Sequence, residues 1–304
     1  MSGWKASDIL SQAGRSAVVT GTGGLGFEAA LELARAGADV IIAGRNPMKG
    51  NHAVAQIRQC VPHGSVRFEL LDLASLNSVA AFGTRLRAQC DRLDLLINNA
   101  AVMMPPKRQA TSDGFELQLG TNYLGHFALT AQLLPLLLNG NNPRVVTVSS
   151  IAARSGAIHF ADLQAEHAYK PLAVYSQSKL ACLMFAFELQ RQSDAAGWGL
   201  TSIGAHPGLS RTDLVANGTG WFSVFGVIRL LFAKILFQPA SDGALPTLFA
   251  ATSAAATAGG YFGPQRFNEM RGAPIVAKAP PQALDIDVAK RLWEVSEQLT
   301  GRFA

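Results

Sequence analysis

Tyr175 and Lys179 are the two residues whose types and spacing most directly suggest chemistry. On a helix, residues four apart lie one above the other on the same face, so the Lys179 ammonium can approach the Tyr175 phenol. A nearby positive charge favours the ionised phenolate and lowers a pKa that is about 10 for a free tyrosine. The pair could therefore donate and accept a proton, although the same spacing also occurs on solvated helix faces.

Residues 144–150, with the sequence RVVTVSS, form a β-branched run that ends in two hydroxyl side chains. This pattern predicts a buried strand that carries Ser149 and Ser150 to its carboxyl end. An irregular segment, residues 151–172, follows, and a helix over residues 173–196 is expected to carry Tyr175 and Lys179. Ser150 and the tyrosine could then meet at the edge of a sheet.

A glycine-rich turn stands near the start of the chain. The strand-like run Ala17-Val-Val-Thr20 precedes it, and residues 27–36, rich in helix formers, follow it. The turn consists of Gly21, Thr22, Gly23, Gly24, Leu25 and Gly26. Strand, glycine turn and helix in this order indicate dinucleotide binding, because the backbone can approach a pyrophosphate that meets free N–H groups at the helix start. A tight turn without a ligand is the alternative.

The residue after the second predicted strand, residues 39–43, bears on the choice of cofactor. In a dinucleotide fold this strand end faces the adenosine ribose, where an acidic side chain suits a 2′-hydroxyl and an arginine suits a 2′-phosphate. Arg45 occupies this place, and Asp39 lies at the opposite end of the strand. The sequence therefore favours NADP(H) over NAD(H). In the alternative interpretation Arg45 is a solvated loop residue that stacks on the adenine.

Other polar residues follow predicted strands or lie in a predicted helix. Asp72, after a strand over residues 65–71, could cap the next helix or face the adenine. Asn98 and Asn99, after a strand over residues 93–97, are expected to close a turn or pin a neighbouring strand. Asn122 lies among apolar neighbours in a predicted helix over residues 119–138. Asparagine has a modest helix propensity, so its presence there requires a buried hydrogen bond or solvent exposure.

The segment after the sixth predicted strand, residues 199–205, is interrupted by His206-Pro207-Gly208. Thr212 lies just beyond, where its hydroxyl could reach a cofactor amide or phosphate. Residues 215–239 are unusually apolar, which fits either a substrate lid, within residues 207–240, or a further core helix.

Strands and helices alternate up to residue 206, which predicts an α/β fold: one doubly wound Rossmann-type domain over residues 1–304, with about seven mainly parallel strands and helices on both faces. In such a sheet ligands bind beyond the carboxyl ends of the strands. The glycine turn, Arg45, the paired asparagines, Ser150 and Pro207 all fall at this edge. Their convergence is the main argument for a dinucleotide site.

Composition excludes several classes of protein. The 304 residues are 49% hydrophobic and 15% charged, as expected for a packed globular chain. The net charge of +5 is scattered without basic runs, so nucleic acid is not an expected partner. Three separated cysteines and the lack of a signal sequence predict a cytoplasmic location. Lys234 and Arg229 interrupt the most apolar stretch, so no membrane span is expected, and the scattered histidines indicate no metal site.

Taken in order, these motifs resemble the short-chain dehydrogenase/reductase family over nearly the whole chain. The resemblance rests on the glycine turn, Leu71-Asp72-Leu73, Asn98-Asn99-Ala100, Asn122, Ser150, Tyr175 with Lys179, and Pro207-Gly208. It is strongest for the branch of retinol dehydrogenases and protochlorophyllide reductase, through Leu96-Ile-Asn-Asn-Ala100, Thr121-Asn-Tyr-Leu-Gly-His-Phe127, Tyr261-Phe-Gly-Pro264 and Arg291-Leu-Trp-Glu294.

The resemblance implies hydride transfer between nicotinamide C4 and a carbonyl or alcohol carbon of a small, fairly apolar substrate. It makes Tyr175 the general acid or base, with Lys179 lowering its pKa and holding the nicotinamide ribose. Ser150 would bind the substrate oxygen, and Asn122 would hold a water in the proton relay. The implied cofactor-binding residues also include Asp72, Leu73, Asn99, Ala100, Pro207, Gly208 and Thr212. The family often forms homo-oligomers through its two long central helices.

Two departures from the family pattern concern the cofactor. The glycine turn is one residue shorter than usual, and Ala101 stands where a glycine is normal, which we expect to shift the cofactor slightly. Two other functions compete with the NADP(H)-dependent oxidoreductase: a dinucleotide-binding redox sensor without chemistry, and a sugar-nucleotide epimerase or dehydratase. The complete set of Asn122, Ser150, Tyr175 and Lys179 argues against the first. The lack of an evident nucleotide-sugar subdomain argues against the second.

Overall fold

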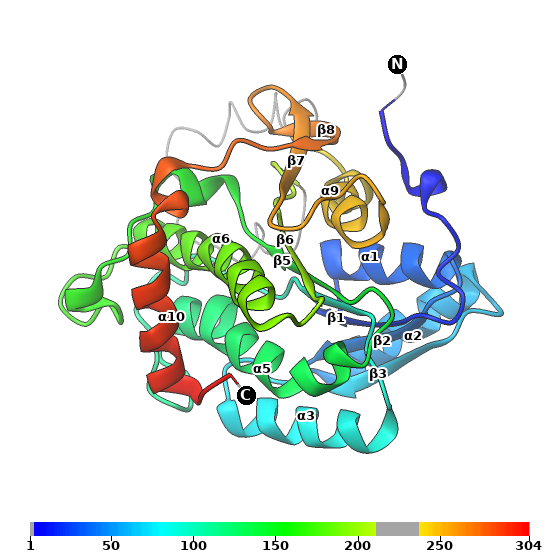
Figure 1. Ribbon diagram of the computed structural model, residues 1–304, viewed down its shortest axis with the longest axis horizontal. Coiled ribbons are helices and arrows are strands. Elements are labelled where there is room, and N and C mark those ends of the chain that lie inside the picture. Colours follow the sequence, from blue (N-terminus) through cyan, green and yellow to red (C-terminus); the bar gives the residue numbers. More distant parts are fainter. Residues whose placement is uncertain (1–2, 211–236, 304) are drawn as a thin grey trace.

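The computed structural model describes residues 3–210 and 237–303, and one eight-stranded sheet runs through them (Figure 1). The strands are β1 (Ser16–Thr20), β2 (Asp39–Gly44), β3 (Val66–Leu70), β4 (Leu95–Asn98), β5 (Arg144–Val148), β6 (Thr201–Ala205), β7 (Tyr261–Arg266) and β8 (Arg271–Val276). Their order is β3-β2-β1-β4-β5-β6-β7-β8, and all neighbours are parallel except β7 and β8. The expected doubly wound, mainly parallel sheet is confirmed.

Helices cover both faces of this sheet (Figure 1). On one face lie α1 (Gly24–Arg35), α2 (Pro47–Cys60) and α9 (Ala240–Thr252). On the other lie α3 (Leu76–Gln89), α5 (Gly125–Leu138), α6 (Pro171–Ala196) and α10 (Ile286–Thr300). Short helical turns are η1 (Ala6–Asp8), α4 (Leu117–Leu119), η2 (Gly120–Leu124), η3 (Ile151–Ser155), η4 (Phe160–Asp162) and η5 (Pro281–Leu284).

The central strands are apolar at successive positions because both of their faces are buried. Side chains alternate across a strand, so Val18 packs into the core under α3, α5 and α6, whereas Val19 packs into the core under α1, α2 and α9. The chain leaves β1 for β2 and β3 on one side and returns to β4 on the other. The crevice of a doubly wound sheet opens where the strand order reverses in this way, between the carboxyl ends of β1 and β4.

Three sequence predictions need correction. The sheet has eight strands, because β7 and β8 form a hairpin that was not expected from segments containing Gly263, Pro264, Gly272 and Pro274. The helix predicted over residues 119–138 begins instead with α4 and passes through the wider turn η2 before α5. Ser75, not Asp72, caps α3, since its side chain accepts a hydrogen bond from the Ser78 N–H.

Helix α10 covers α5 and α6, the two long central helices (Figure 1). Its Trp293 lies 5.0 Å from the ring of Phe127 and 5.9 Å from that of Phe185, and the Phe303 ring lies 4.5 Å away. These contacts form one aromatic cluster that fixes α10 to the core. A homo-oligomer that paired through α5 and α6 would have to accommodate α10.

Buried His126 links α5 to β1 and η2. Its Nδ1 lies 2.9 Å from the Asn122 main-chain oxygen, and its Nε2 lies 2.9 Å from Thr20 Oγ1. A carbonyl can only accept, so Nδ1 carries the hydrogen and Nε2 accepts from the threonine hydroxyl. Burial, with a smaller contribution from the charge of Lys179, lowers the pKa of His126 to about 4, although the hydrogen bond to Asn122 opposes the shift. The ring is therefore neutral near pH 7.

Replacing Trp293 by alanine should lower the free energy of unfolding by about 3 kcal/mol, because the change removes the centre of the aromatic cluster and leaves a cavity. Urea titration followed by circular dichroism measures this loss. Leu284→Ala, at a side chain that is 58% exposed, is the control and should cost under about 0.5 kcal/mol. Equal losses for the two variants would contradict the packing described for α10.

His126→Gln should flatten the dependence of stability on pH between pH 6.5 and about 4. The unfolded imidazole takes up a proton in this range and the folded one does not, so its contribution is complete above pH 6.5 and is lost as the pH falls. The wild type should lose up to about 1.4 kcal/mol more per pH unit than the variant. Urea titrations at pH 7, 6 and 5 compare the slopes, and parallel slopes would show that His126 titrates normally in the fold.

Candidate active site

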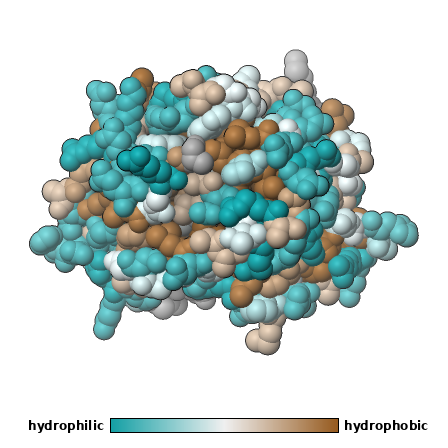
Figure 2. All heavy atoms as spheres, turned by 60° about the horizontal axis from the view of Figure 1, so that its bottom comes forward, coloured by the Kyte–Doolittle hydropathy of each residue, from teal (hydrophilic) through white to brown (hydrophobic). Residues whose placement is uncertain are grey.

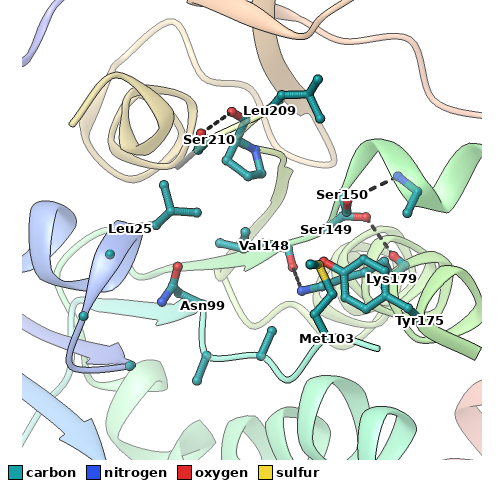
Figure 3. A pocket seen from close by; sticks show the side chains of 18 of the residues that line it. Leu25, Asn99, Met103, Val148, Ser149, Ser150, Tyr175, Lys179, Leu209 and Ser210 are labelled. Atoms are coloured by element: carbon teal, nitrogen blue, oxygen red, sulfur yellow. Dashed lines mark hydrogen bonds between the residues drawn. The ribbon is translucent and has the colours of Figure 1, made fainter. Parts of the chain in front are cut away.

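A cavity of about 690 Å³ lies at the carboxyl edge of the sheet (Figure 3). Its lining comes from the glycine turn, from the segments that follow β4, β5 and β6, and from one face each of α2 and α6. The polar and charged side chains of this lining are Thr22, Lys49, His52, Gln56, Asn99, Ser149, Ser150, Tyr175, Lys179 and Ser210. The structure thus brings together groups that are far apart in the sequence.

Ser150, Tyr175 and Lys179 converge in this cavity, as the sequence predicts (Figure 3). Helix α6 begins at Pro171, whose fixed φ suits a first helical turn, and so presents Tyr175 and Lys179 one turn apart. Ser149 Oγ donates to the Lys179 carbonyl over 2.7 Å and therefore ties β5 to α6. Ser150 Oγ accepts from the Ala152 N–H over 3.2 Å and caps η3, and it also hydrogen-bonds the Tyr175 phenol.

The electrostatics of Tyr175 differ from the sequence prediction. Burial raises its pKa to about 12, and the hydrogen bond with Ser150 only partly offsets the shift. Lys179 is not among the groups that shift this pKa. Its Nζ donates to the Val148 carbonyl over 2.9 Å (Figure 3). Burial also lowers the pKa of Lys179. A lysine ammonium has three hydrogens, so the remaining two are available to a bound molecule.

Asn122 does not line the cavity but lies in η2, where it is 1% exposed. Its Nδ2 donates to the Val102 carbonyl and to Ser178 Oγ, and its Oδ1 accepts from the Val102 N–H. Its main-chain oxygen accepts from His126 and from the Cys182 thiol over 3.1 Å. Asn122 therefore anchors the segment after β4 to α6. Its expected role of holding a relay water stays a prediction.

The glycine turn fits a dinucleotide in two respects. Gly21 and Gly24 have φ values of 100° and 50°, which glycine adopts without strain. A Cβ on Gly26 would lie 2.5 Å from the Gly21 oxygen and 2.6 Å from Asn99 Nδ2. Only glycine at position 26 therefore lets the first turn of α1 pack this closely against Gly21 and Asn99. No side chain caps α1 at Gly23. Its first N–H groups are thus free to meet an anion.

Asn99 has the structural role expected of the paired asparagines. Its Nδ2 donates to the Thr20 carbonyl over 2.8 Å, and its N–H and that of Ala100 both donate to Thr20 Oγ1. These bonds join the end of β4 to the end of β1. Asn99, Ala100 and Ala101 also line the cavity. Contact of Asn99 and Ala100 with a bound cofactor stays a prediction.

Arg45 is exposed and does not line the cavity, and its contact with a 2′-phosphate stays a prediction. The cavity is also lined from α2 by Lys49, His52 and Gln56, which were not predicted from the sequence. Their spacing of three and four residues along a predicted helix was the signal that could have found them.

Asp72 and Leu73 do not line the cavity either. Asp72 Oδ1 accepts from the Ala74 N–H over 3.0 Å, which closes a local turn. Leu73 is 7% exposed and packs against α5, because its carbonyl oxygen occupies the space that a Cβ on Gly125 would need. Both residues shape the turn after β3, and contact with the adenine stays a prediction.

Pro207 and Gly208 form part of the cavity lining, together with Leu209 and Ser210. Thr212 and most of the apolar segment over residues 215–239 lie outside the described residues. Within residues 3–210 and 237–303 no group of histidine, cysteine and acidic side chains could hold a metal ion. In the same part of the chain no helix is long and apolar enough to cross a membrane.

Comparison with known proteins identifies the family. The family model for short chain dehydrogenase matches residues 15–221. Polyprenol dehydrogenase of Mus musculus is 40% identical over 295 residues, which cover 95% of this chain and 85% of the relative. Retinol dehydrogenase 13 of Mus musculus is 39% identical over 294 residues, covering 95% of this chain and 84% of that protein.

Two solved structures support the same assignment. An uncharacterised protein of Mycobacterium paratuberculosis is 40% identical, with a TM-score of 0.83 and full coverage of both chains. An NAD(P)-dependent gluconate 5-dehydrogenase structure from Beutenbergia cavernae, with bound NADP, is 27% identical, with a TM-score of 0.63 over 83% of this chain and 95% of that one. With Ser150, Tyr175 and Lys179 gathered beside the glycine turn, this chain belongs to the short-chain dehydrogenase/reductase family of oxidoreductases.

Proposed function

We propose that this protein is an NADP(H)-dependent oxidoreductase that interconverts the carbonyl and alcohol forms of an apolar small molecule. The observation that carries the proposal is the convergence of Ser150, Tyr175 and Lys179 in one cavity with the glycine turn. A dinucleotide held by that turn would extend toward Pro207 and Gly208, which also line the cavity. Its reactive ring would then lie beside the tyrosine.

The bound nicotinamide supplies or takes up the hydride, and the side chains handle the proton. In carbonyl reduction Ser150 donates a hydrogen bond to the substrate oxygen and polarises the carbonyl. Tyr175 gives its phenolic proton to the same oxygen as negative charge develops there, and it takes a proton back in the oxidation direction. Lys179 directs its two remaining hydrogens into the cavity, where they can bind the hydroxyls of the nicotinamide ribose.

The preference for NADP(H) is supported by positive charge on the adenosine side. Lys49, in the first turn of α2, lines the cavity, and His52 follows it on the same face of α2. A 2′-phosphate would gain from these groups and a 2′-hydroxyl would not. The structure of the Beutenbergia cavernae relative with bound NADP agrees with this preference.

A long apolar alcohol or aldehyde is the substrate class that the cavity favours. Met103, Met104, Ile151, Leu172 and Phe237 contribute apolar side chains to its lining. Methionines are unbranched and adapt to irregular apolar ligands. Among the relatives, the polyprenol dehydrogenase and the retinol dehydrogenase are named for isoprenoid alcohols. We therefore propose a polyprenol- or retinoid-like substrate.

Tyr175→Phe should reduce NADPH-dependent turnover of an isoprenoid aldehyde by at least about a hundredfold, because it removes the proton donor. NADPH affinity, measured by quenching of protein fluorescence, should change little. The matched control is Tyr123→Phe, since Tyr123 is also buried, and its hydroxyl lies 2.6 Å from Ser296 away from the cavity. Turnover by Tyr175→Phe at the rate of the control would remove Tyr175 from the mechanism.

Lys49→Ala should weaken binding of NADPH about tenfold and leave the weaker binding of NADH nearly unchanged, because only NADPH carries the 2′-phosphate. Titration of each cofactor into the wild type and the variant checks this. Arg45→Ala tests the sequence prediction beside it and should have the smaller effect, since Arg45 does not line the cavity. A Lys49 variant that lost NADH and NADPH affinity equally would argue against recognition of the 2′-phosphate at this site.

A further inference from the structure

The carboxylate of Glu269 joins the segments that carry two walls of the cavity. Its Oε2 lies 2.7 Å from Arg154 Nη2 and 2.9 Å from His206 Nε2, and its side chain is only 12% exposed. Arg154 belongs to η3, which follows Ser150, and His206 precedes the Pro207–Ser210 loop. Glu269 Oε1 accepts from the Lys278 N–H over 2.9 Å. Each of these partners of the carboxylate is a donor.

The hydrogen bonds of His206 determine which of its nitrogens faces Glu269 as a donor. Its Nδ1 accepts from the Gly208 N–H over 3.3 Å, so Nε2 carries the hydrogen and donates to the carboxylate. A Cβ on Gly263 would overlap this Nε2, so a glycine in β7 leaves the space that the ring occupies. Burial raises the pKa of Glu269, but the bonds from His206 and Lys278 outweigh it and hold the value at about 2. The carboxylate is thus charged.

The turn that presents Glu269 has an unusual backbone. Phe267, Asn268 and Glu269 have φ values of 53°, 54° and 66°. Such a left-handed run costs free energy in residues with a Cβ. Contacts to the cavity walls hold this turn, since Arg154 Nη1 donates to the Asn268 carbonyl over 3.2 Å and the Met270 carbonyl accepts from the Leu209 N–H over 2.8 Å. The strained turn is therefore fastened to both segments that Glu269 joins.

The approach of this turn to the loop is close. Gly208 has a φ of 64°, and a Cβ there would overlap the Met270 carbonyl oxygen. The Pro207–Ser210 loop therefore has little freedom to move toward the β7–β8 hairpin. On the other side of the carboxylate, Ser150, Ile151 and Ala152 line the cavity directly before Arg154.

We propose that Glu269 is a positioning residue that sets the spacing between the Ser150 wall of the cavity and the Pro207–Ser210 loop. The inference rests on the proposed function, in which these two walls hold the substrate oxygen and the nicotinamide. Loss of the charge weakens or breaks the hydrogen bonds from Arg154 and His206 to their shared acceptor, and the loop is then free to shift. The adenosine half of the cofactor binds at the far end of the cavity, so overall cofactor affinity is largely kept.

Glu269→Gln tests the proposal, because both carboxylate oxygens of Glu269 accept from donors. The amide NH₂ of glutamine must therefore face either the Lys278 N–H or the Arg154 and His206 donors. Misplacement of reacting atoms by about 1 Å can cost a hundredfold in rate, so we expect kcat to fall by between about tenfold and a hundredfold. The Kd of NADPH should stay within about threefold. The primary deuterium isotope effect on kcat with NADPH labelled at C4 should rise, because hydride transfer becomes the slow step.

The matched control is Glu188→Gln on α6. Glu188 Oε2 also lies 2.7 Å from an arginine nitrogen, Arg191 Nε, its Oε1 accepts from Gln192, and it does not line the cavity. This variant should keep kcat and the isotope effect of the wild type. Arg154→Met should reproduce the effects of Glu269→Gln, and the double variant should lose little more, because both changes break one network.

Wild-type kcat and an unchanged isotope effect in both Glu269→Gln and Arg154→Met would overturn the proposal. The proposal would also be overturned if Glu269→Gln lost activity only in proportion to its loss of thermal stability, as in Glu188→Gln. If Glu269→Gln does not fold, Arg154→Met alone decides between these outcomes.

Failure of the proposed function has a different signature. If the wild type binds NADPH but reduces no carbonyl in a broad panel, the proposed function fails while the spacing proposal is still tested. Acrylamide should then quench the nicotinamide fluorescence of bound NADPH more strongly in Glu269→Gln than in the wild type. Equal quenching would overturn the proposal.

Discussion

The hydroxyl of Thr20 holds together the crevice on which the site depends. It accepts the N–H groups of Asn99 and Ala100 and bonds His126, each over 2.9 Å. These bonds join the end of β1, the end of β4 and the start of α5 at the point where the strand order reverses. A doubly wound sheet opens at such a point, and an open crevice needs bonds of this kind to keep its two sides in register. The glycine turn begins at the next residue.

Burial governs the chemistry on the other side of the cavity, because Tyr175 itself is buried. Elsewhere, as on the face in Figure 2, apolar side chains are exposed among polar ones. An apolar wall excludes water and raises the pKa of the phenol. The hydrogen bond with Ser150 lowers this pKa and partly offsets the effect of burial. Ser149 and Asn122 contribute indirectly: Ser149 ties β5 to α6, and Asn122 ties the segment after β4 to α6. The reactive groups are therefore set by a rigid frame, as precise catalysis requires.

Much of this arrangement follows from local sequence patterns. Apolar runs of strand length, the glycine turn and the four-residue spacing of Tyr175 and Lys179 each have one main physical interpretation, and the sheet then brings them to the same edge. The β7–β8 hairpin was missed because its glycines and prolines are typical of loops; the structure shows that Gly263 leaves room for His206, a contact distant in sequence. The direction of the Lys179 ammonium was also beyond sequence patterns, because it depends on the Val148 carbonyl of another element. Likewise, Arg45 follows the family pattern, but side-chain geometry places Lys49 in the cavity.

We propose that NADPH delivers a hydride to the substrate in this cavity while Tyr175 supplies the proton. Transfer of deuterium to a long-chain isoprenoid aldehyde from NADPH deuterated at both C4 positions, followed by mass spectrometry of the alcohol, tests it most directly. The claim predicts one deuterium at C1 of the alcohol made by the wild type and almost no alcohol made by Tyr175→Phe. Unlabelled alcohol from the wild type, or equal labelled product from both proteins, would contradict it.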